Sequence, residues 1–138
     1  MSNQTKLLVS TIYDALEAQD VKTIVSLFDP SVEVQSPPTL PWSQGTYHGI
    51  DGAMAYFTSA LEYLDQNAFI VEEVHAEGDW AASIGRWTGR FRATGGEFDV
   101  RFVHFWDFKD GLVVRCSGIS DTHGIVLGYQ AEPVTAGS

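Results

Sequence analysis

The hydrophobic period of this chain changes once, close to Ala68, and this change constrains the fold more than any other feature of the sequence. Before it, apolar residues recur at spacings of three and four, which is typical of amphipathic helices. After it, apolar and polar residues alternate, which is typical of half-buried strands. The alternating runs cover residues 68–75, 80–93, 97–108 and 112–121, and short Gly-containing turns separate them. We therefore expect helices first and then an antiparallel meander of about four long strands.

The N-terminal part is predicted to hold three helices. Asp20 is placed to cap the second, which we expect to end at Asp29-Pro30, and residues 50–64 carry the apolar stripe of the third. Residues 31–35 alternate like a short strand. Residues 36–49 are rich in Pro and Gly and are predicted to form a long loop.

Helices followed by a meander predict an α+β fold. We expect a cone-shaped roll, in which the three N-terminal helices pack in the concave face of a curved, mainly antiparallel sheet. The length of 138 residues fits one domain, which we assign to residues 1–129, with residues 130–138 as a flexible C-terminal tail. Such a roll encloses a cavity between the helices and the sheet.

Charge and composition exclude several classes of partner. The formal net charge of −10 repels phosphate backbones and anionic lipids, so neither nucleic acid nor a membrane is expected as a partner. The charge is uneven: residues 1–80 carry 12 acids against two lysines, and residues 81–138 carry six acids and six bases. The single cysteine and the lack of a secretion-signal pattern favour a cytoplasmic protein. Because the histidines are scattered and no nucleotide-binding motif follows a strand, we expect no metal and no cofactor.

Strand alternation assigns side chains to the two faces of the predicted sheet. His104 and Trp106 share one face, which we place toward the cavity. The neighbouring strands then add Gly85, Trp87, Phe91, Cys116, Gly118 and Ser120 to that face. A bulge within residues 80–93 would reverse the assignment of that strand.

The opposite face of the sheet combines arginines with large apolar side chains. Its members are Arg86, Arg90, Arg92, Arg101, Arg115, Val103 and Phe105. Arginine together with aromatic residues is typical of protein interfaces, so we expect a homodimer through this face. The alternative is a solvated face with exposed apolar residues.

Several segments, taken in order and spacing, resemble the SnoaL-like, ketosteroid-isomerase-related branch of the nuclear transport factor 2-like superfamily. They are residues 12–16, 24–28, 41–42, 45–49, 101–106 and 110–111, and the resemblance extends over nearly the whole chain. It implies the roll fold. It leaves the reaction open, because this fold hosts isomerases, cyclases, dehydratases, epoxide hydrolases and non-enzymatic adaptors.

The catalytic groups of two such relatives do not carry over to this chain. By the resemblance, the proton-shuttling Asp of ketosteroid isomerase falls on Val34, and its oxyanion-binding Asp falls on His104. Its oxyanion-binding Tyr falls on Ile12, or on Tyr13 if the helix is shifted by one residue. The Asp-Arg-Asp set of limonene epoxide hydrolase is absent as well. We therefore expect neither of these two activities.

His104 is the candidate catalytic residue, with Tyr13 assisting it. An imidazole titrates near neutrality, so it could exchange a proton with a carbonyl or enol, or donate a hydrogen bond to an oxyanion. The alternative is a core histidine whose polar atoms are satisfied by Tyr13 or the backbone. The expected substrate-binding residues are Trp42, Tyr47, Phe57, Trp87, Trp106, Cys116 and Ser120.

These residues predict a small cofactor-independent enzyme that acts by acid/base chemistry on an apolar carbonyl or polyketide-like molecule in an enclosed pocket. The reaction would be that of an isomerase, a cyclase or a dehydratase. Two alternatives remain open: a non-catalytic protein that binds a hydrophobic small molecule, and a protein-interaction or dimerisation module of the same fold.

Overall fold

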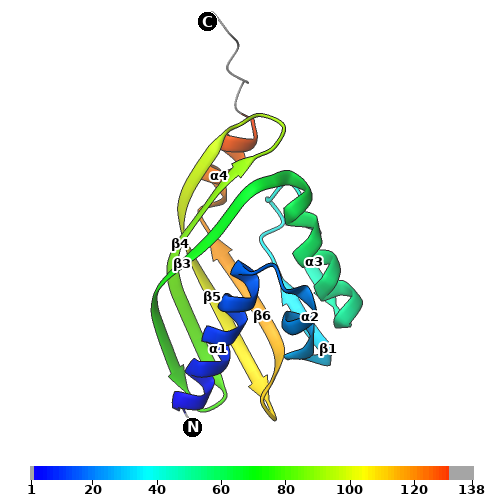
Figure 1. Cartoon of the computed structure of the whole chain (residues 1–138), viewed down its shortest axis with the longest axis vertical. Coiled ribbons are helices and arrows are strands. Elements are labelled where there is room, and N and C mark those ends of the chain that lie inside the picture. Colours follow the sequence, from blue (N-terminus) through cyan, green and yellow to red (C-terminus); the bar gives the residue numbers. More distant parts are fainter. Residues whose placement is uncertain (1, 131–138) are drawn as a thin grey trace, which may run out of the picture.

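The computed structural model describes residues 2–130 as helices on the concave side of one sheet (Figure 1). The helices are α1 (Ser2–Glu17), α2 (Val21–Ser26), α3 (Gly49–Tyr63) and α4 (Thr122–Tyr129). The strands are β1 (Phe28–Gln35), β2 (Thr46–His48), β3 (Leu64–Glu77), β4 (Trp80–Phe91), β5 (Glu97–Lys109) and β6 (Leu112–Ser120). The predicted α+β roll is therefore confirmed.

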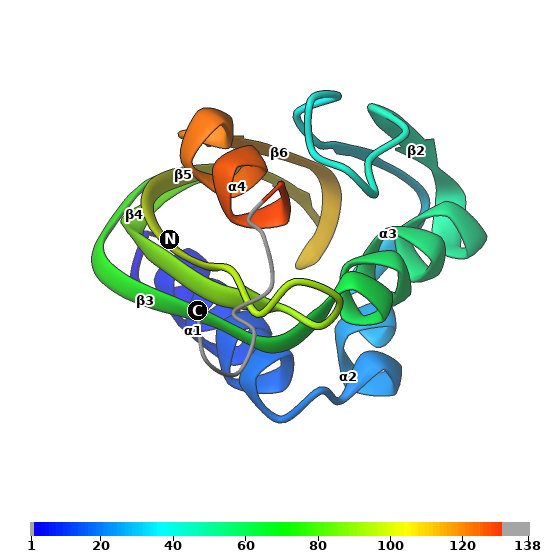
Figure 2. The same cartoon turned by 90° about the horizontal axis from the view of Figure 1, so that it is seen from above.

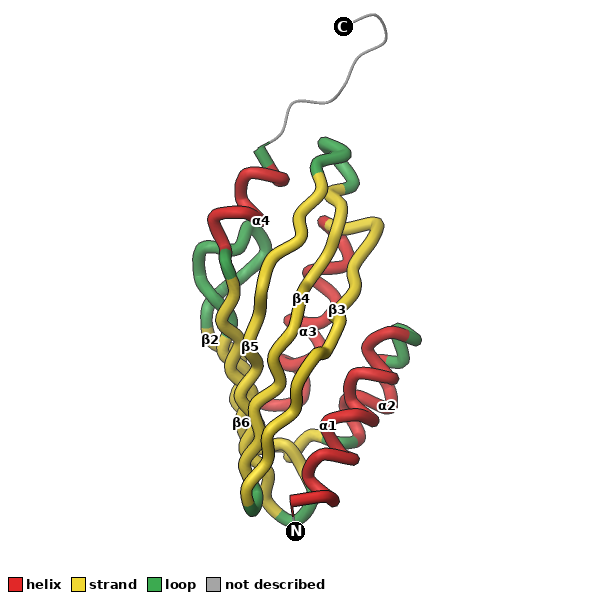
Figure 3. The backbone as a smooth tube through the Cα atoms, turned by 90° about the vertical axis from the view of Figure 1, so that its left-hand side faces the viewer, coloured by secondary structure: helices red, strands yellow, loops and turns green. Residues whose placement is uncertain are grey.

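The six strands form one sheet in the order β2-β1-β6-β5-β4-β3. All neighbours are antiparallel except β1 and β6, which are parallel. Figure 2 shows the strands as an arc, with α1 and α3 on its concave side. Figure 3 shows that β3, β4 and β5 run along most of the length of the molecule. The predicted meander is thus β3 to β6. The strands β1 and β2, which precede α3 in the sequence, extend the sheet beyond β6.

The second helix is shorter than predicted. Asp20 caps α2 as expected, because its carboxylate accepts the backbone N–H of Thr23 at 3.1 Å. The helix ends at Ser26, however, and Phe28 already lies in β1 beside β6. The expected end at Asp29-Pro30 is therefore wrong. Strand pairing and the burial of Phe28 outweigh a short helical period.

The predicted loop at residues 36–49 contains a short strand. β2 pairs with β1, and Tyr47 lies opposite Val34. The hydroxyl of Tyr47 accepts the backbone N–H of Gln44 at 2.9 Å. This aromatic residue therefore holds the loop against the body of the domain.

The meander starts earlier than predicted and is bent by a bulge. Leu64, which the helical pattern assigned to the third helix, opens β3. β3 is bulged between Val71 and Glu73, opposite Gly85 of β4. A Cβ at Gly85 would lie 1.9 Å from the carbonyl oxygen of Ile70, so only glycine allows this close approach of the two backbones.

The helix at the C-terminal end, α4, was not predicted. Asp121 caps it by accepting the backbone N–H of Gly124 at 3.4 Å, and Ile125 is buried. Gln130 closes α4 by donating its N–H to the carbonyl of Val126. The rest of the predicted tail lies outside the described residues. None of the described helices has the length and apolar character needed to cross a membrane.

The two faces of the sheet are as predicted. β4 pairs with β5 without interruption from Trp80 to Arg90, so no bulge reverses the assignment of this strand. Phe102 and Trp106 are buried on the inner face, and His104 is 8% exposed. The inner face therefore forms the core and the wall beneath the helices.

Ion pairs hold most of the arginines on the outer face. Arg86 binds Asp99, Arg90 lies 2.8 Å from Asp65, and Arg115 lies 3.2 Å from Glu33. Arg92 departs from the prediction, since its guanidinium donates to the carbonyls of Leu61 and Leu64. It thus binds the end of α3, because helix-terminal carbonyls lack partners within the helix.

Candidate functional site

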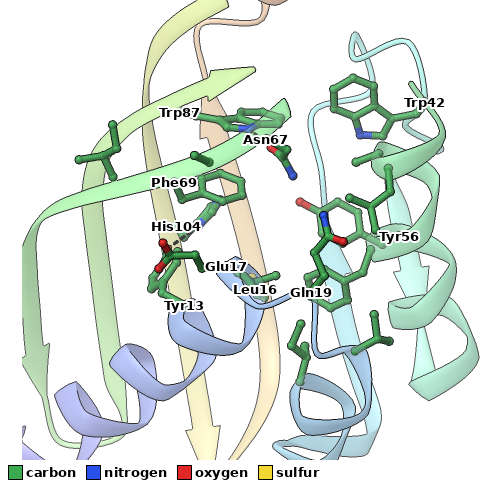
Figure 4. A pocket seen from close by; sticks show the side chains of 18 of the residues that line it. Tyr13, Leu16, Glu17, Gln19, Trp42, Tyr56, Asn67, Phe69, Trp87 and His104 are labelled. Carbon is green, nitrogen blue, oxygen red and sulfur yellow. Dashed lines mark hydrogen bonds between the residues drawn. The ribbon is translucent and has the colours of Figure 1, made fainter. Parts of the chain in front are cut away.

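A cavity of about 200 Å³ lies between the concave face of the sheet and the helices. Its wall is largely aromatic, with Tyr13, Trp42, Tyr56, Phe57, Phe69, Trp87 and Trp106. Its polar groups are those of Glu17, Gln19, Asn67, His104 and Cys116. Figure 4 shows Tyr13 and His104 on one side of this space, with Tyr56 and Trp42 on the other. Among residues 2–130, no three His, Cys, Asp or Glu side chains are grouped so that they could hold a metal ion.

A chain of hydrogen bonds runs through the wall from Trp106 to His104. Trp106 Nε1 donates to Ser83 Oγ at 3.0 Å. Ser83 Oγ lies 2.6 Å from the hydroxyl of Tyr13, which in turn lies 2.5 Å from Nδ1 of His104. Ser83 is fully buried, so the chain begins in the core and ends at the cavity.

Only one placement of hydrogens gives every polar group in this series of hydrogen bonds a partner. An indole N–H can only donate, so Ser83 Oγ accepts the hydrogen bond from Trp106. The Ser83 hydroxyl then donates a hydrogen bond to Tyr13, and the Tyr13 hydroxyl donates one to His104. The reverse direction would leave the Ser83 hydrogen without an acceptor among residues 2–130, at a cost of about 1–3 kcal/mol for a buried group. Nδ1 of His104 is therefore the acceptor. In the neutral imidazole the proton then lies on Nε2.

Burial keeps the titratable groups of this wall neutral. It lowers the pKa of His104 to about 3 and raises the pKa of the Cys116 thiol to about 12. It also raises the pKa of Tyr13 far above the usual tyrosine value. At pH 7 His104 is therefore a neutral imidazole that offers Nε2–H as a hydrogen-bond donor. Of the two roles predicted for His104, this favours donation to an oxyanion over proton transfer from an imidazolium.

Residues 9–116 match the family of SnoaL-like domains. The chain belongs to this family. The predicted membership of the nuclear transport factor 2-like superfamily is confirmed, and the fold seen here agrees with it.

Solved structures share the fold of this SnoaL-like domain. An NTF2-like protein from Burkholderia thailandensis is 25% identical with a TM-score of 0.86, over 94% of this chain and 98% of that one. A candidate SnoaL-like polyketide cyclase from Jannaschia sp. is 22% identical with a TM-score of 0.84, over 96% of each chain. TerC, co-crystallised with polyporic acid, is 22% identical with a TM-score of 0.80, over 89% of this chain and 95% of that one. No curated protein matches the sequence significantly.

Most of the predicted site residues of the SnoaL-like domain meet at the cavity. Tyr13, Trp42, Phe57, Trp87, His104, Trp106 and Cys116 all line it. Tyr47 and Ser120 are not among the lining residues: Tyr47 fixes the preceding loop, and Ser120 ends β6 opposite Phe102. Ile12 is fully buried in the core, so Tyr13 is the one of the two register alternatives that faces the cavity.

The aromatic wall is held together around Trp87. Its indole Nε1 donates to Asn67 Oδ1 at 2.5 Å, and its ring stacks on Phe69 at 5.0 Å. Trp42, from the loop before β2, meets Trp87 edge to face at 5.9 Å. The loop therefore contributes to the cavity through Trp42.

Ser83 and two polar residues of the cavity, Glu17 and Gln19, were not predicted from the sequence. Ser83 lies directly opposite His104 in the β4–β5 register, so the alternation used for the other strands could have placed it on the inner face. Glu17 and Gln19 lie where α1 ends, and strand alternation does not apply there. The direction of their side chains depends on how that helix terminates.

The end of α1 has a backbone arrangement that usually requires glycine. The N–H of Asp20 binds the carbonyl of Ala15 at 2.8 Å, and the N–H of Gln19 binds that of Leu16 at 3.1 Å, which together form a Schellman motif. Gln19 has φ +55°, in the left-handed region. This conformation costs a non-glycine residue about 1 kcal/mol or more. The strained residue is also one that lines the cavity.

Proposed function

We propose that this SnoaL-like domain is an enzyme that binds an apolar carbonyl compound and stabilises negative charge on the carbonyl oxygen. The observation that carries this proposal is the directed hydrogen-bond chain that ends at His104 in an aromatic cavity. Nδ1 is occupied by Tyr13, and Nε2 has no hydrogen-bond partner among residues 2–130. Its N–H is therefore free to bind a ligand oxygen.

The chemistry follows from the charge that an enolising carbonyl compound develops. As the α-proton leaves, negative charge grows on the carbonyl oxygen. A fixed donor in a low-dielectric wall stabilises this charge more than it stabilises the neutral ketone, which lowers the barrier. Removing one such donor typically slows a reaction by about 10²–10³-fold. In this scheme Tyr13 is a positioning residue, because it acts on the orientation and tautomer of His104.

The size and the wall of the cavity indicate the class of ligand. The cavity measures about 200 Å³, below the roughly 300–1,000 Å³ of sites for drug-sized ligands. This size favours a compound with one or two rings inside the wall. Flat apolar rings suit the aromatic side chains that surround the space. The polyketide cyclase candidate and the TerC complex among the structural neighbours support an oxygen-bearing aromatic ligand.

The bicyclic ketone β-tetralone tests this proposal. Three tryptophans, Trp42, Trp87 and Trp106, line the cavity, so binding should change the tryptophan fluorescence. Enolisation is followed in heavy water by proton NMR, as the exchange of α-hydrogens for deuterium. His104→Phe removes the donor and keeps an aromatic ring, and we expect it to slow exchange by about 10²-fold or more.

A matched control uses a histidine outside the cavity. His75→Phe, at an exposed position on β3, should leave the exchange rate unchanged. If the ketone binds but the wild-type protein exchanges it no faster than buffer does, the proposal is wrong and the non-catalytic binding alternative is supported. A ketone that does not bind contradicts the proposed ligand class.

We also propose that two copies of the chain pair through the outer face of the sheet. Ile84, Val103 and Ile119 lie side by side across β4, β5 and β6. Trp80 stacks on Phe105 at 6.3 Å next to this row. Ile119 is 58% exposed and Trp80 is 41% exposed, so this apolar surface faces solvent in a single copy. Apolar surface of this kind is typical of interfaces.

The charge distribution favours a second copy as the occupant of this face. Residues 81–138, which supply nearly all of β4, β5 and β6, carry six acids and six bases, and the acidic excess lies in residues 1–80. Two copies that meet through these strands keep most of their acidic surface apart. The ion pairs of Arg86 with Asp99 and of Arg115 with Glu33 neutralise two of the arginines of this face.

A further inference from the structure

We infer that Glu17 is the general base of this site and removes the α-proton of the bound carbonyl compound. The inference rests on the proposed function and adds a catalytic residue to it. It also fixes the direction of the ligand. The carbonyl oxygen lies at His104, and the reacting carbon lies toward the end of α1.

The position of Glu17 on α1 brings its side chain to the cavity. Glu17 is the last residue of α1 and follows Tyr13 by four positions, so both side chains lie on the same side of the helix. Both residues line the cavity. Figure 4 shows the Glu17 side chain directed toward Tyr13 and His104. The carboxylate and the oxyanion donor therefore line the same cavity.

The other titratable groups of the cavity are unsuited to accept a proton. Burial holds His104, Tyr13 and Cys116 in their neutral forms at pH 7, and it raises the pKa of the Tyr56 hydroxyl as well. A neutral hydroxyl or thiol is a poor base. Nδ1 of His104 is occupied by the hydrogen bond from Tyr13. Glu17 is exposed and is the one carboxylate among the lining residues of the described chain.

The proposed step balances without a co-reactant. A carboxylate oxygen of Glu17 takes the α-proton, and the electron pair of the broken C–H bond forms the C=C bond of an enolate. The π pair of the carbonyl moves to its oxygen, where Nε2–H of His104 binds it. Return of the proton from Glu17 to the same carbon gives exchange, and return to another carbon gives an isomer. The enzyme ends each cycle with Glu17 ionised.

The chain turns sharply just after this carboxylate. The Schellman motif after Glu17 turns the chain sharply into α2, and the left-handed Gln19 brings a second polar side chain to the same lining. Asp14 is also exposed on α1, but it is not among the lining residues. The two acids of this helix therefore differ in their access to a ligand, which makes Asp14 a matched control.

The test compares Glu17→Gln with Asp14→Asn in the β-tetralone exchange assay. We expect Glu17→Gln to slow exchange by about 10²–10⁴-fold, with the dissociation constant changed by no more than a few-fold, because general-base catalysis contributes in this range. Asp14→Asn should exchange at the wild-type rate. Added formate should restore part of the exchange in Glu17→Ala, since a small carboxylate can enter the space that the truncated side chain leaves. A purely structural role for Glu17 would not give such rescue.

The outcomes separate this inference from the proposed function. If Glu17→Gln retains the wild-type rate while His104→Phe loses it, the oxyanion site stands and Glu17 is not the base. If formate fails to restore exchange in a folded Glu17→Ala that has lost it, the role of Glu17 as base is contradicted. If the wild-type protein binds the ketone without exchanging it, the proposed function fails and this inference fails with it.

Discussion

The hydroxyl of Tyr13 lies 2.5 Å from Nδ1 of His104, and the planes of the two rings are only 10° apart. This bond joins α1 to the central strand β5. Because the Tyr13 hydroxyl accepts a hydrogen bond from Ser83, its own hydrogen is directed to the imidazole of His104. The bond therefore determines which nitrogen of His104 is free to face a ligand.

The first prediction concerns the tautomer of His104. Nitrogen NMR of the imidazole at pH 7 should show a protonated Nε2 and an unprotonated Nδ1. Tyr13→Phe removes the donor to Nδ1 and should allow the other tautomer to appear. A wild-type protein with its proton on Nδ1 would contradict the direction of the hydrogen-bond chain.

A second prediction concerns Ser83. Ser83→Ala deprives the buried Trp106 Nε1–H of its acceptor, so the free energy of unfolding should fall by about 1–3 kcal/mol. Urea denaturation followed by fluorescence measures this change. Ser117→Ala, at a half-buried position on β6, should change stability by no more than about 0.5 kcal/mol. Equal effects of the two substitutions would show that the Ser83 hydroxyl has no special role.

The third prediction is a pH dependence of stability. The pKa of His104 is about 3 in the folded state, against 6.5 for an ordinary histidine. Between these values the unfolded chain binds more protons, so the free energy of unfolding should fall as the pH drops from 6.5 toward 3. Through His104 alone, the free energy of unfolding should fall by about 1.4 kcal/mol for each pH unit in this interval. Above pH 6.5 the imidazole is neutral in both states, and no stability is lost through it.

Urea denaturation between pH 5 and 7 measures this slope, and a comparison with His104→Gln gives the part that is due to His104. The Arg86 and Arg90 guanidinium groups lower the pKa values of Asp99 and Asp65 below the usual 3.8, so these carboxylates titrate outside that interval. His104→Gln should flatten the profile. An unchanged slope in this variant would assign the pH dependence to other groups.

A fourth prediction separates stability from binding at Gln19. Gln19→Gly relieves the left-handed strain and should raise the free energy of unfolding by about 0.5–1 kcal/mol. It also removes an amide from the cavity, so the affinity for β-tetralone should fall roughly two- to tenfold, the equivalent of one hydrogen bond. Asp110→Gly changes the other left-handed non-glycine residue, in the β5–β6 turn, and should leave affinity unchanged. A Gln19→Gly protein with wild-type affinity would remove Gln19 from the binding site.

The fifth prediction concerns the outer face. Size-exclusion chromatography with light scattering should give twice the chain mass of 15.2 kDa for the wild-type protein. Phe105→Glu places a charge beside Trp80 in the proposed interface and should yield monomers. Leu7→Glu, on the 68% exposed position of α1, should remain dimeric. A monomeric wild-type protein would leave the outer face available to other partners.

Much of the sheet could be predicted from the sequence because its signals are local. The Asp110-Gly111 turn, with φ of +53° and +77°, joins β5 and β6 as an Asp-Gly pair is expected to do. The alternation along β5 correctly placed His104 and Trp106 inside and Arg101 outside. The expected end of the second helix failed at Phe28, where pairing with a strand distant in sequence decides the conformation.

The candidate site likewise contains residues that could be placed from the sequence and residues that could not. Residues of the sheet such as His104, Trp87 and Cys116 were placed correctly, since each lies on a strand whose two faces differ in polarity. Tyr13 remained one of two alternatives, because the rotation of α1 about its axis is set by packing against the sheet. Glu17 was missed altogether. Its approach to the cavity depends on a helix end that no hydrophobic period describes.

The amino-acid sequence by itself determined the helices followed by a meander and the family of the chain. It also determined the two faces of the meander, because successive side chains of a strand point to opposite faces of the sheet. Only the tertiary structure decided that Ser83, Tyr13 and His104 form one series of hydrogen bonds and that Glu17 lines the same cavity. These contacts join segments up to 91 positions apart. They depend on how α1 packs onto the sheet, and that packing is a property of the whole core.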